Sequence, residues 1–179
     1  MYFDILMLRV LADGPQHGYE IKKSVERILG GRSINNNVLY PALRRFEEQG
    51  AIEPVAAEAG PGRPPRNVYR LTDTGHDLLQ AMIRDADPAL LADDNEFHTR
   101  VAFFADLDVE ERLRIIGARR AIVESSIAHL GAMRPEAAAA QPWGVQVTDF
   151  NLGQKRQELG WLDHLALAAA EPAATAASQ

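Results

Sequence analysis

Three runs of apolar residues near the start of the chain repeat at helical spacing. Residues 3–12 are apolar almost all round, which predicts a helix buried on most sides. Apolar residues recur every three or four positions over 17–29 and again from Asn37 towards Gly50, which predicts two amphipathic helices. Asp13-Gly14-Pro15 and Gly30-Gly31 separate the three segments. The pattern therefore indicates a short three-helix unit.

The next pattern changes from helical to strand-like. Residues 51–55 and 67–72 are strand-like, and the segment between them carries Gly60-Pro61-Gly62-Arg63-Pro64-Pro65, which cannot form a helix. We expect a β-hairpin with a long tip. Thr72-Asp73-Thr74 then caps a fourth helix, whose Leu78, Leu79, Met82 and Ile83 repeat at helical spacing. This order of elements predicts a winged helix.

The second half of the chain shows helical patterns only. Residues 96–105 predict a short helix, and Asp108 and Glu111 have the spacing of a capping box, so a long helix should begin there. Pro135 and Pro142 bracket an alanine-rich turn, and the last helix is expected over 147–170 with one stripe of Leu152, Leu159, Leu162, Ala166 and Ala169. The two long helices should form an antiparallel hairpin.

Together these patterns predict a mainly α fold with a minor β part (α+β minor), a winged helix-turn-helix followed by a helical antiparallel dimerisation domain. We expect a DNA-binding domain over 1–86, a dimerisation and effector domain over 87–170, and a disordered tail over 171–179. Neither long helix can hide its apolar stripe completely against the other, so a second copy should cover the rest in a two-fold homodimer. The predicted dimerisation residues are Leu113, Ile116, Arg120, Val123, Ile127, Leu130, Leu159, Trp161, Leu162 and Leu165.

Composition narrows the functional classes. The 179 residues include no cysteine, which excludes disulfides, thiolate zinc sites and cysteine nucleophiles, and the cytoplasm is the expected location. The apolar run at the start is too short to span a bilayer, so no membrane partner is expected. The five histidines are widely separated, which indicates no metal site. We find no catalytic constellation and no cofactor motif, and predict that the chain is not an enzyme.

The distribution of charge favours a nucleic-acid partner despite a net charge of −6. Residues 1–85 hold eleven basic and eleven acidic side chains, whereas residues 86–179 hold eight and fourteen. Within residues 22–70 nine basic side chains face five acidic ones, a local net charge of +4. Charges more than about 8–10 Å away are screened at physiological salt, so the acidic second half does not exclude double-stranded DNA.

The third helix carries the side chains best suited to read DNA. Its inward face leaves Asn36, Tyr40 and Arg44 outward together, and an asparagine can form a bidentate pair with adenine. The alternative is that the asparagines only cap the helix. Pro41 indicates that the helix starts near Asn37, since proline is tolerated only near a first turn or at a kink. The candidate contacts from this helix and its approach are Ser33, Asn35, Asn36, Asn37, Tyr40 and Arg44.

Two further groups of basic residues are candidates for DNA contact. Arg63 at the hairpin tip could enter a narrow minor groove while Arg66 meets a flanking phosphate, or the tip could be a solvated loop. Lys22, Lys23 and Arg27 could contact phosphates. The alternative is that this run of charges is only the solvent-exposed face of a helix.

Aromatic residues of the second half are candidates for a small-molecule site. Phe103, Phe104, Trp143, Phe150 and Trp161 could line an effector pocket at the dimer interface, but aromatics at helical spacing are more often core. Arg120 stands alone in an apolar seam, where it could form a salt bridge across the dimer or hold an acidic effector.

Several motifs resemble the PadR family of bacterial transcriptional regulators. They are His17-Gly18-Tyr19-Glu20-Ile21, Leu39-Tyr40-Pro41-Ala42-Leu43-Arg44-Arg45-Phe46-Glu47, Gly62-Arg63-Pro64 and Tyr69-Arg70-Leu71-Thr72-Asp73-Thr74-Gly75, and they cover residues 1–80. Arg156-Gln157-Glu158-Leu159-Gly160-Trp161-Leu162 is similar to the end of the virulence-activator-like domain in larger members.

The resemblance implies a homodimeric regulator, usually a repressor, and some members release DNA on binding phenolic acids or other aromatic compounds. It also implies that Tyr19 lies near the phosphate backbone; the alternative is a half-buried packing residue. Asn35-Asn36-Asn37 departs from the small residues common in members, which leaves base preference open. The alternatives that remain are a winged-helix scaffold that binds proteins without DNA, and a repressor without an effector.

Overall fold

The computed structural model describes residues 1–58, 66–140 and 142–171, with the side chains of 56–58, 66, 135–140 and 142 left aside. The chain divides into two compact units, Met1–Ile83 and Arg84–Gln179. Each unit has its own core.

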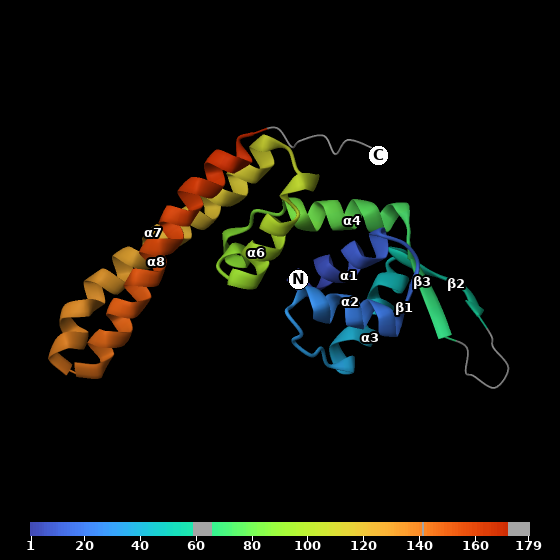
Figure 1. Cartoon of the computed structure of the whole chain (residues 1–179), viewed down its shortest axis with the longest axis horizontal. Helices are drawn as coiled ribbons and strands as arrows, with labels where there is room; N and C mark the ends of the chain where they lie inside the picture. Colours follow the sequence, from blue (N-terminus) through green and yellow to red (C-terminus); the bar gives the residue numbers. More distant parts are fainter. Residues whose placement is uncertain (59–65, 141, 172–179) are drawn as a thin grey trace. The chain divides into compact units, whose positions relative to one another are not determined.

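The first unit contains three helices, a small sheet and a fourth helix (Figure 1). The helices are α1 (Tyr2–Ala12), α2 (Gly18–Ile28), α3 (Asn36–Glu48) and α4 (Asp73–Arg84). The strands are β1 (Gln16–His17), β2 (Ile52–Glu58) and β3 (Arg66–Leu71), and β3 lies between the other two in an antiparallel sheet. The fold class predicted from the sequence, a mainly α chain with a winged helix, is confirmed. The two-residue strand β1 was not predicted, because it is too short to show any alternation of apolar residues.

The core of the first unit comes from the apolar faces that the sequence pattern indicated. In α1 all of residues 5–8 are at most 2% exposed, and in α3 the inward residues Leu39, Leu43 and Phe46 are at most 1% exposed. These side chains fix which way α3 is rotated. The opposite face of α3 is therefore presented to solvent.

One glycine determines how α4 joins the sheet. A Cβ built at Gly75 would stand 2.1 Å from the carbonyl oxygen of Ala51, so only glycine allows this approach. Thr72 completes the junction: its hydroxyl donates to the carbonyl of Gly50 at 2.6 Å and accepts from the backbone N–H of Gly75 at 3.1 Å. The predicted cap of the fourth helix is thus confirmed.

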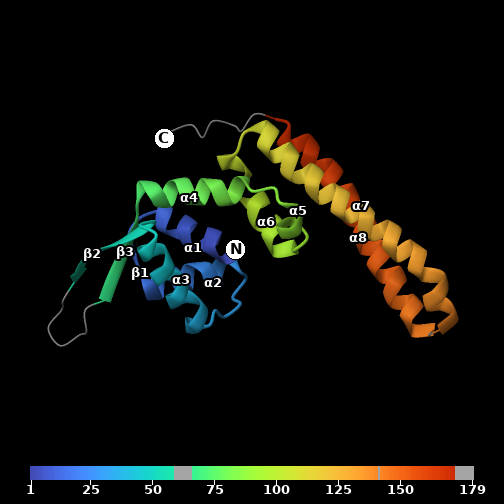
Figure 2. The same ribbon diagram turned by 180° about the vertical axis from the view of Figure 1, so that it is seen from behind.

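The second unit consists of short helices and one long helical hairpin. Its elements are α5 (Pro88–Leu91), α6 (Asp94–Ala102), the short 3₁₀ helix η1 (Phe104–Asp106), α7 (Val109–Ala140) and α8 (Pro142–Ala169). Figures 1 and 2 show α7 and α8 side by side along their length. They run antiparallel, since Arg134 pairs with Asp149 at one end and Arg112 donates to the carbonyl of Glu171 at the other.

The sequence located the start of α7 correctly and the turn after it incorrectly. The predicted capping box is present, because the Glu111 N–H donates to Asp108 at 2.8 Å and the Asp108 N–H donates to Glu111 at 3.1 Å. However, α7 continues through Pro135 to Ala140, and α8 begins at Pro142 rather than at Val147. The expected proline-bracketed turn is therefore much shorter than predicted. The predicted tail falls, from residue 172 onward, outside the described residues.

The buried face of α7 also differs from the predicted seam. Arg112, Ile115, Ile116, Arg119 and Val123 are at most 5% exposed. Leu113 is 38% exposed, and the side chain of Arg120 is 31% exposed and pairs with Asp163. The dimerisation roles proposed for Leu113 and Arg120 stay predictions. The burial of Arg112 and Arg119 was not predicted, because an apolar pattern counts arginines as surface residues.

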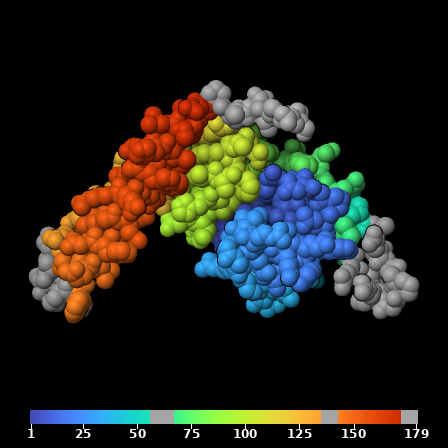
Figure 3. Space-filling model, in the orientation of Figure 1, coloured from blue at the N-terminus to red at the C-terminus, as the bar shows by residue number. Residues whose placement is uncertain are grey.

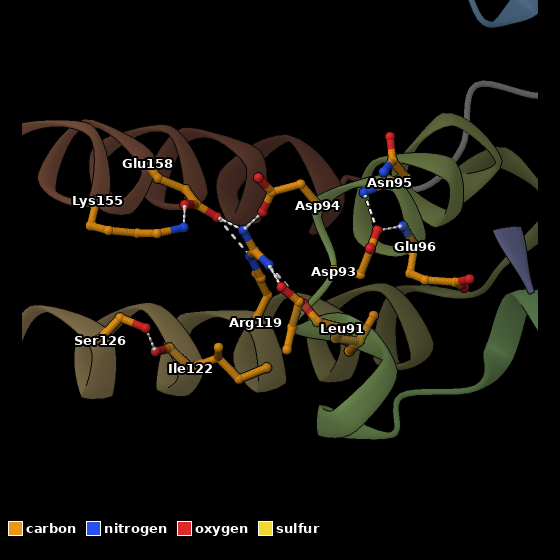
Figure 4. Close-up of polar contacts among 11 residues, drawn as sticks. Leu91, Asp93, Asp94, Asn95, Glu96, Arg119, Ile122, Ser126, Lys155 and Glu158 are labelled. Carbon is orange, nitrogen blue, oxygen red and sulfur yellow. Dashed lines mark hydrogen bonds and ion pairs between the residues drawn. The ribbon is translucent and has the colours of Figure 1, made fainter. Parts of the chain in front are cut away.

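Arg119 is the polar centre of the second unit (Figure 4). Its guanidinium is 1% exposed and donates to Glu158 of α8 at 2.6 Å, to the carbonyls of Leu91 and Ala92 at 2.8 and 3.2 Å, and to Asp94. One side chain thereby satisfies carbonyls at the end of α5 and links them to α6, α7 and α8.

Candidate nucleic-acid interface

The exposed face of α3 begins with residues suited to polar recognition. Asn36, Tyr40 and Arg44 are exposed, Tyr40 by half of its surface, and they follow one another at intervals of four residues. The first turn of α3 carries no acidic residue. No side chain of that turn therefore offsets the positive end of the helix dipole. An open depression runs along this face and is lined by Asn36, Asn37, Tyr40, Pro41, Arg44, Arg45 and Glu48. α3 begins at Asn36, which confirms the start near Asn37 that Pro41 indicated, and Pro41 lies in its second turn.

The three consecutive asparagines have different surroundings. Asn35 is the N-cap, and its side-chain oxygen accepts from the backbone N–H of Asn37 at 2.9 Å. The capping interpretation therefore holds for Asn35. Asn36 accepts instead from the ammonium of Lys22 at 2.8 Å, and the side chain of Asn37 is exposed.

A carboxylate that the sequence analysis did not single out organises the approach to α3. Glu26 accepts from the backbone N–H of Ile34 at 2.9 Å and from the hydroxyl of Ser33 at 3.5 Å. The same carboxylate lies 3.9 Å from the ammonium of Lys22. Glu26 thus connects α2 to the segment before α3. Its sequence position on a charged helix face gave no sign of this role.

Helix α2 packs closely against α3 near Tyr40. A Cβ at Gly18 would lie 3.4 Å from the ring of Tyr40 and 3.5 Å from Leu43, which is ordinary van der Waals contact between the two helices. Tyr19 is 62% exposed, so most of its ring is accessible to a partner, and its role near a phosphate backbone stays a prediction. The ammonium of Lys23 lies 5.3 Å from the centre of the Tyr19 ring, a cation–π distance.

The basic residues of the first unit divide into paired and unpaired side chains. Arg45 pairs with Asp4 at 2.6 Å, and Arg70 pairs with Glu53. Arg27, Arg32 and Arg44 are exposed and form no ion pair with any described residue. The positive charge available to a partner is therefore concentrated on α2, on the segment after it and on the outer face of α3.

The hairpin tip contributes less to the described interface. Arg63 lies outside the described residues, and Arg66 is described only as the first backbone position of β3. The roles predicted for these two arginines stay predictions.

The aromatic residues proposed for an effector site are spread over the second unit. Phe104 is buried, whereas Trp143 and Phe150 are 82% and 64% exposed. Trp143 and Trp161 stand eighteen residues apart on α8, which at a rise of 1.5 Å per residue is about 27 Å. One copy of the chain therefore does not bring these two tryptophans into one pocket.

Trp161 belongs to a smaller aromatic group. Its ring meets those of Phe97 and His98 edge-on at 5.9 and 5.7 Å between centroids. Trp161 and His98 also line a depression with Gln154, Lys155 and Gln157, beside the ion pairs of Arg119.

The positions proposed for dimerisation differ in burial. Ile116, Val123 and Leu162 are at most 2% exposed within the single chain. Ile127, Leu130, Leu159 and Leu165 are half-buried, and Leu113, Arg120 and Trp161 keep about a third or more of their surface exposed.

The described residues form neither a membrane-spanning helix nor a metal-binding cluster. No helix there is long and apolar enough to cross a bilayer. No three histidine or acidic side chains in the same ranges gather closely enough to hold a metal ion.

Comparison with known proteins places the first unit in a family. The model described as the transcriptional regulator PadR-like family matches residues 7–81. An uncharacterized 37.1 kDa protein in transposon TN4556 of Streptomyces fradiae is 40% identical over 76 residues, which are 42% of this chain and 20% of that protein. The match thus spans about a fifth of that curated relative.

This chain is also similar to solved structures of PadR proteins. A PadR family transcription regulator from Clostridium difficile is 31% identical over 45% of this chain and 82% of its own, with a TM-score of 0.39. Bacillus subtilis PadR in complex with operator DNA is 19% identical over 94% of this chain and 99% of its own, with a TM-score of 0.45.

Proposed function

We propose that this chain, which belongs through residues 7–81 to the PadR-like family of transcriptional regulators, binds DNA. In this proposal it represses transcription by binding a pseudo-palindromic operator as a homodimer. It does so in the cytoplasm and without catalysing a reaction. The observation that carries the proposal is the exposed row of Asn36, Tyr40 and Arg44 on α3, whose opposite face is fixed in the core.

In the proposed complex α3 enters the major groove by its first turns. Asn36 and Asn37 face base edges, and Tyr40 gives its hydroxyl to a phosphate or its ring to a thymine methyl group. Arg44 and the exposed basic side chains of α2, Lys23 and Arg27, neutralise phosphates on either side. Tyr19 and Ser33 are also exposed, which supports backbone contacts from them.

A salt series on DNA binding tests this proposal. The logarithm of affinity should fall linearly with the logarithm of salt concentration, and Arg44→Ala should reduce that slope by about one. Arg45→Ala is the matched control, because Asp4 already offsets the charge of Arg45. A salt-independent affinity would remove DNA binding and favour a scaffold that binds a protein.

A stripe of exposed apolar side chains on α8 supports the homodimer. Trp143, Val147, Phe150 and Trp161 are between 39% and 82% exposed and fall on one heptad repeat with Gln154 and Gln157 between them. Figure 3 shows α8 forming the near face of the hairpin. Exposed apolar stripes of this kind mark protein interfaces, and two copies can cover each other's stripes.

The mass of the purified protein in solution tests the dimer. Phe150→Asp should convert dimers to monomers in light scattering coupled to gel filtration. Leu167→Asp, which changes a 73% exposed leucine outside the heptad stripe, should leave the dimer intact. A wild-type monomer would contradict the proposed assembly.

We also propose that a small aromatic compound releases the repressor from DNA. The depression beside Trp161 and His98 supports this, because it offers ring faces next to the ammonium of Lys155. Binding should quench tryptophan fluorescence and raise the melting temperature. A panel of aromatic acids that changes neither quantity would favour a repressor without an effector.

A further inference from the structure

The hydrogen bond between Lys22 and Asn36 constrains how the asparagine amide can be used. The two polar atoms, Nζ and Oδ1, are 2.8 Å apart. An ammonium group can only donate, so the amide atom that faces it must be the carbonyl oxygen. The amide NH₂ of Asn36 consequently points away from Lys22, and its two protons are available to a partner.

Lys22 is itself held in position. Its side chain is only 22% exposed, and its ammonium lies 3.9 Å from the carboxylate of Glu26. Glu26 is tied in turn to the backbone N–H of Ile34. The ammonium therefore belongs to a fixed network that joins α2 to the start of α3, unlike the ammonium of Lys23 on the outer surface.

This arrangement disfavours adenine. Bidentate pairing of asparagine with adenine requires the amide oxygen to accept from the adenine amino group. Here that oxygen already accepts from a cation, and the positive charge would stand close to the hydrogens of the adenine amino group. Guanine presents two acceptors in the major groove, N7 and O6, and no donor on the same base edge. Both the free amide protons and the nearby positive charge match those acceptors.

We propose that Asn36, oriented by Lys22, selects guanine at one position of each half-site, and that Lys22 is a positioning residue for base recognition rather than a phosphate contact. The proposal rests on the proposed function, since it assigns a base to the DNA-binding face already described. It also revises the expectation of adenine that asparagine alone suggests.

The test is selection from a library of random duplexes, followed by affinity measurements on the selected half-site with guanine or adenine at the contacted position. Wild-type protein should prefer guanine by about tenfold, and replacing that guanine with 7-deazaguanine should remove most of the preference. Lys22→Met frees the amide to turn, so the preference should disappear or shift to adenine. Lys22→Arg keeps a cationic donor and should retain guanine.

Lys23→Met is the matched control, because it removes the same charge from the same helix without touching Asn36. It should weaken binding to both duplexes by the same factor and leave their ratio unchanged. Adenine preference in the wild type, or equal effects of Lys22→Met and Lys23→Met on the ratio, would overturn the inference while leaving DNA binding in place. Failure to bind any duplex would overturn the proposed function and this inference together.

Discussion

Replacing Arg119 with methionine should destabilise the second unit far more than the same change at the neighbouring Arg120. Methionine keeps most of the aliphatic volume but removes the guanidinium. In the wild type that group is 1% exposed and donates to two backbone carbonyls, to Glu158 and to Asp94. Arg120 is 31% exposed and pairs with Asp163 and Glu124.

The expected loss of stability depends on which hydrogen-bond partners each acceptor retains after the substitution. The carbonyls of Leu91 and Ala92 lose a donor, at about 1 kcal/mol each. Glu158 remains 15% exposed and retains Lys155 at 2.8 Å, and Asp94 is well exposed, so both carboxylates are partly compensated. We expect a total of about 3 kcal/mol, at the lower end of the range for breaking a buried ion pair. Arg120→Met removes surface ion pairs and should cost about 0–1 kcal/mol.

Tryptophan fluorescence during urea unfolding measures this loss selectively, because both tryptophans, Trp143 and Trp161, belong to the second unit. The urea midpoint of Arg119→Met should fall well below those of the wild type and Arg120→Met, with similar slopes. A loss below about 1 kcal/mol, or equal losses in the two variants, would refute the idea that this guanidinium organises the unit.

Three further predictions concern single positions. Gly75→Ala should destabilise the first unit by about 1–3 kcal/mol, because its Cβ would clash with the carbonyl oxygen of Ala51. The helical Gly117→Ala, whose Cβ would meet nothing within 4 Å, should instead stabilise the second unit by up to about 1 kcal/mol. Calorimetry that gave both changes the same sign would contradict the clash at Gly75. Partial burial raises the pKa of Asp94, but the hydrogen bond and charge of Arg119 outweigh this effect and hold that pKa below 3.8. The Asp94–Arg119 ion pair therefore stabilises the fold above pH 3.8, and this stabilisation is lost as the pH falls through the lowered pKa. The urea midpoint of Asp94→Asn should therefore lie below that of the wild type at neutral pH and converge with it in acid, and a difference independent of pH would count against this linkage. Asn35→Ala should lower stability by about 1 kcal/mol without altering the selected DNA sequence, and an altered sequence would assign Asn35 to base recognition.

Local signals in the sequence predicted most elements of the first unit. Helical spacing of apolar residues, the Thr72 cap and the loop-forming glycines and prolines all act over a few residues. They can therefore be recognised without knowing the tertiary structure. The same holds for the Asp108–Glu111 box at the start of α7.

The buried face of α7 in the long hairpin could not be predicted from local signals in the same way. An apolar pattern counts Arg112 and Arg119 as surface residues, because a buried arginine is favourable only when acceptors surround it. Those acceptors come from elsewhere in the chain: the carbonyl of Phe104 for Arg112, and Glu158 with two carbonyls for Arg119. The sequence within a few residues of either arginine does not indicate these partners. The predicted seam consequently ran through Leu113 and Arg120 and left out Arg112 and Arg119.

The three asparagines before and within α3 show why residue type alone does not assign a role at a binding surface. Identical side chains stand at positions 35, 36 and 37, yet one caps the helix and the next accepts from a cation. The difference arises from the helix start, which turns the Asn35 oxygen back to the backbone, and from Glu26, which holds Lys22 beside Asn36. Base preference on this surface therefore depends on α2 as much as on α3. An operator prediction that considers α3 alone would select the wrong base wherever a neighbouring cation has already engaged the carbonyl of the reading amide.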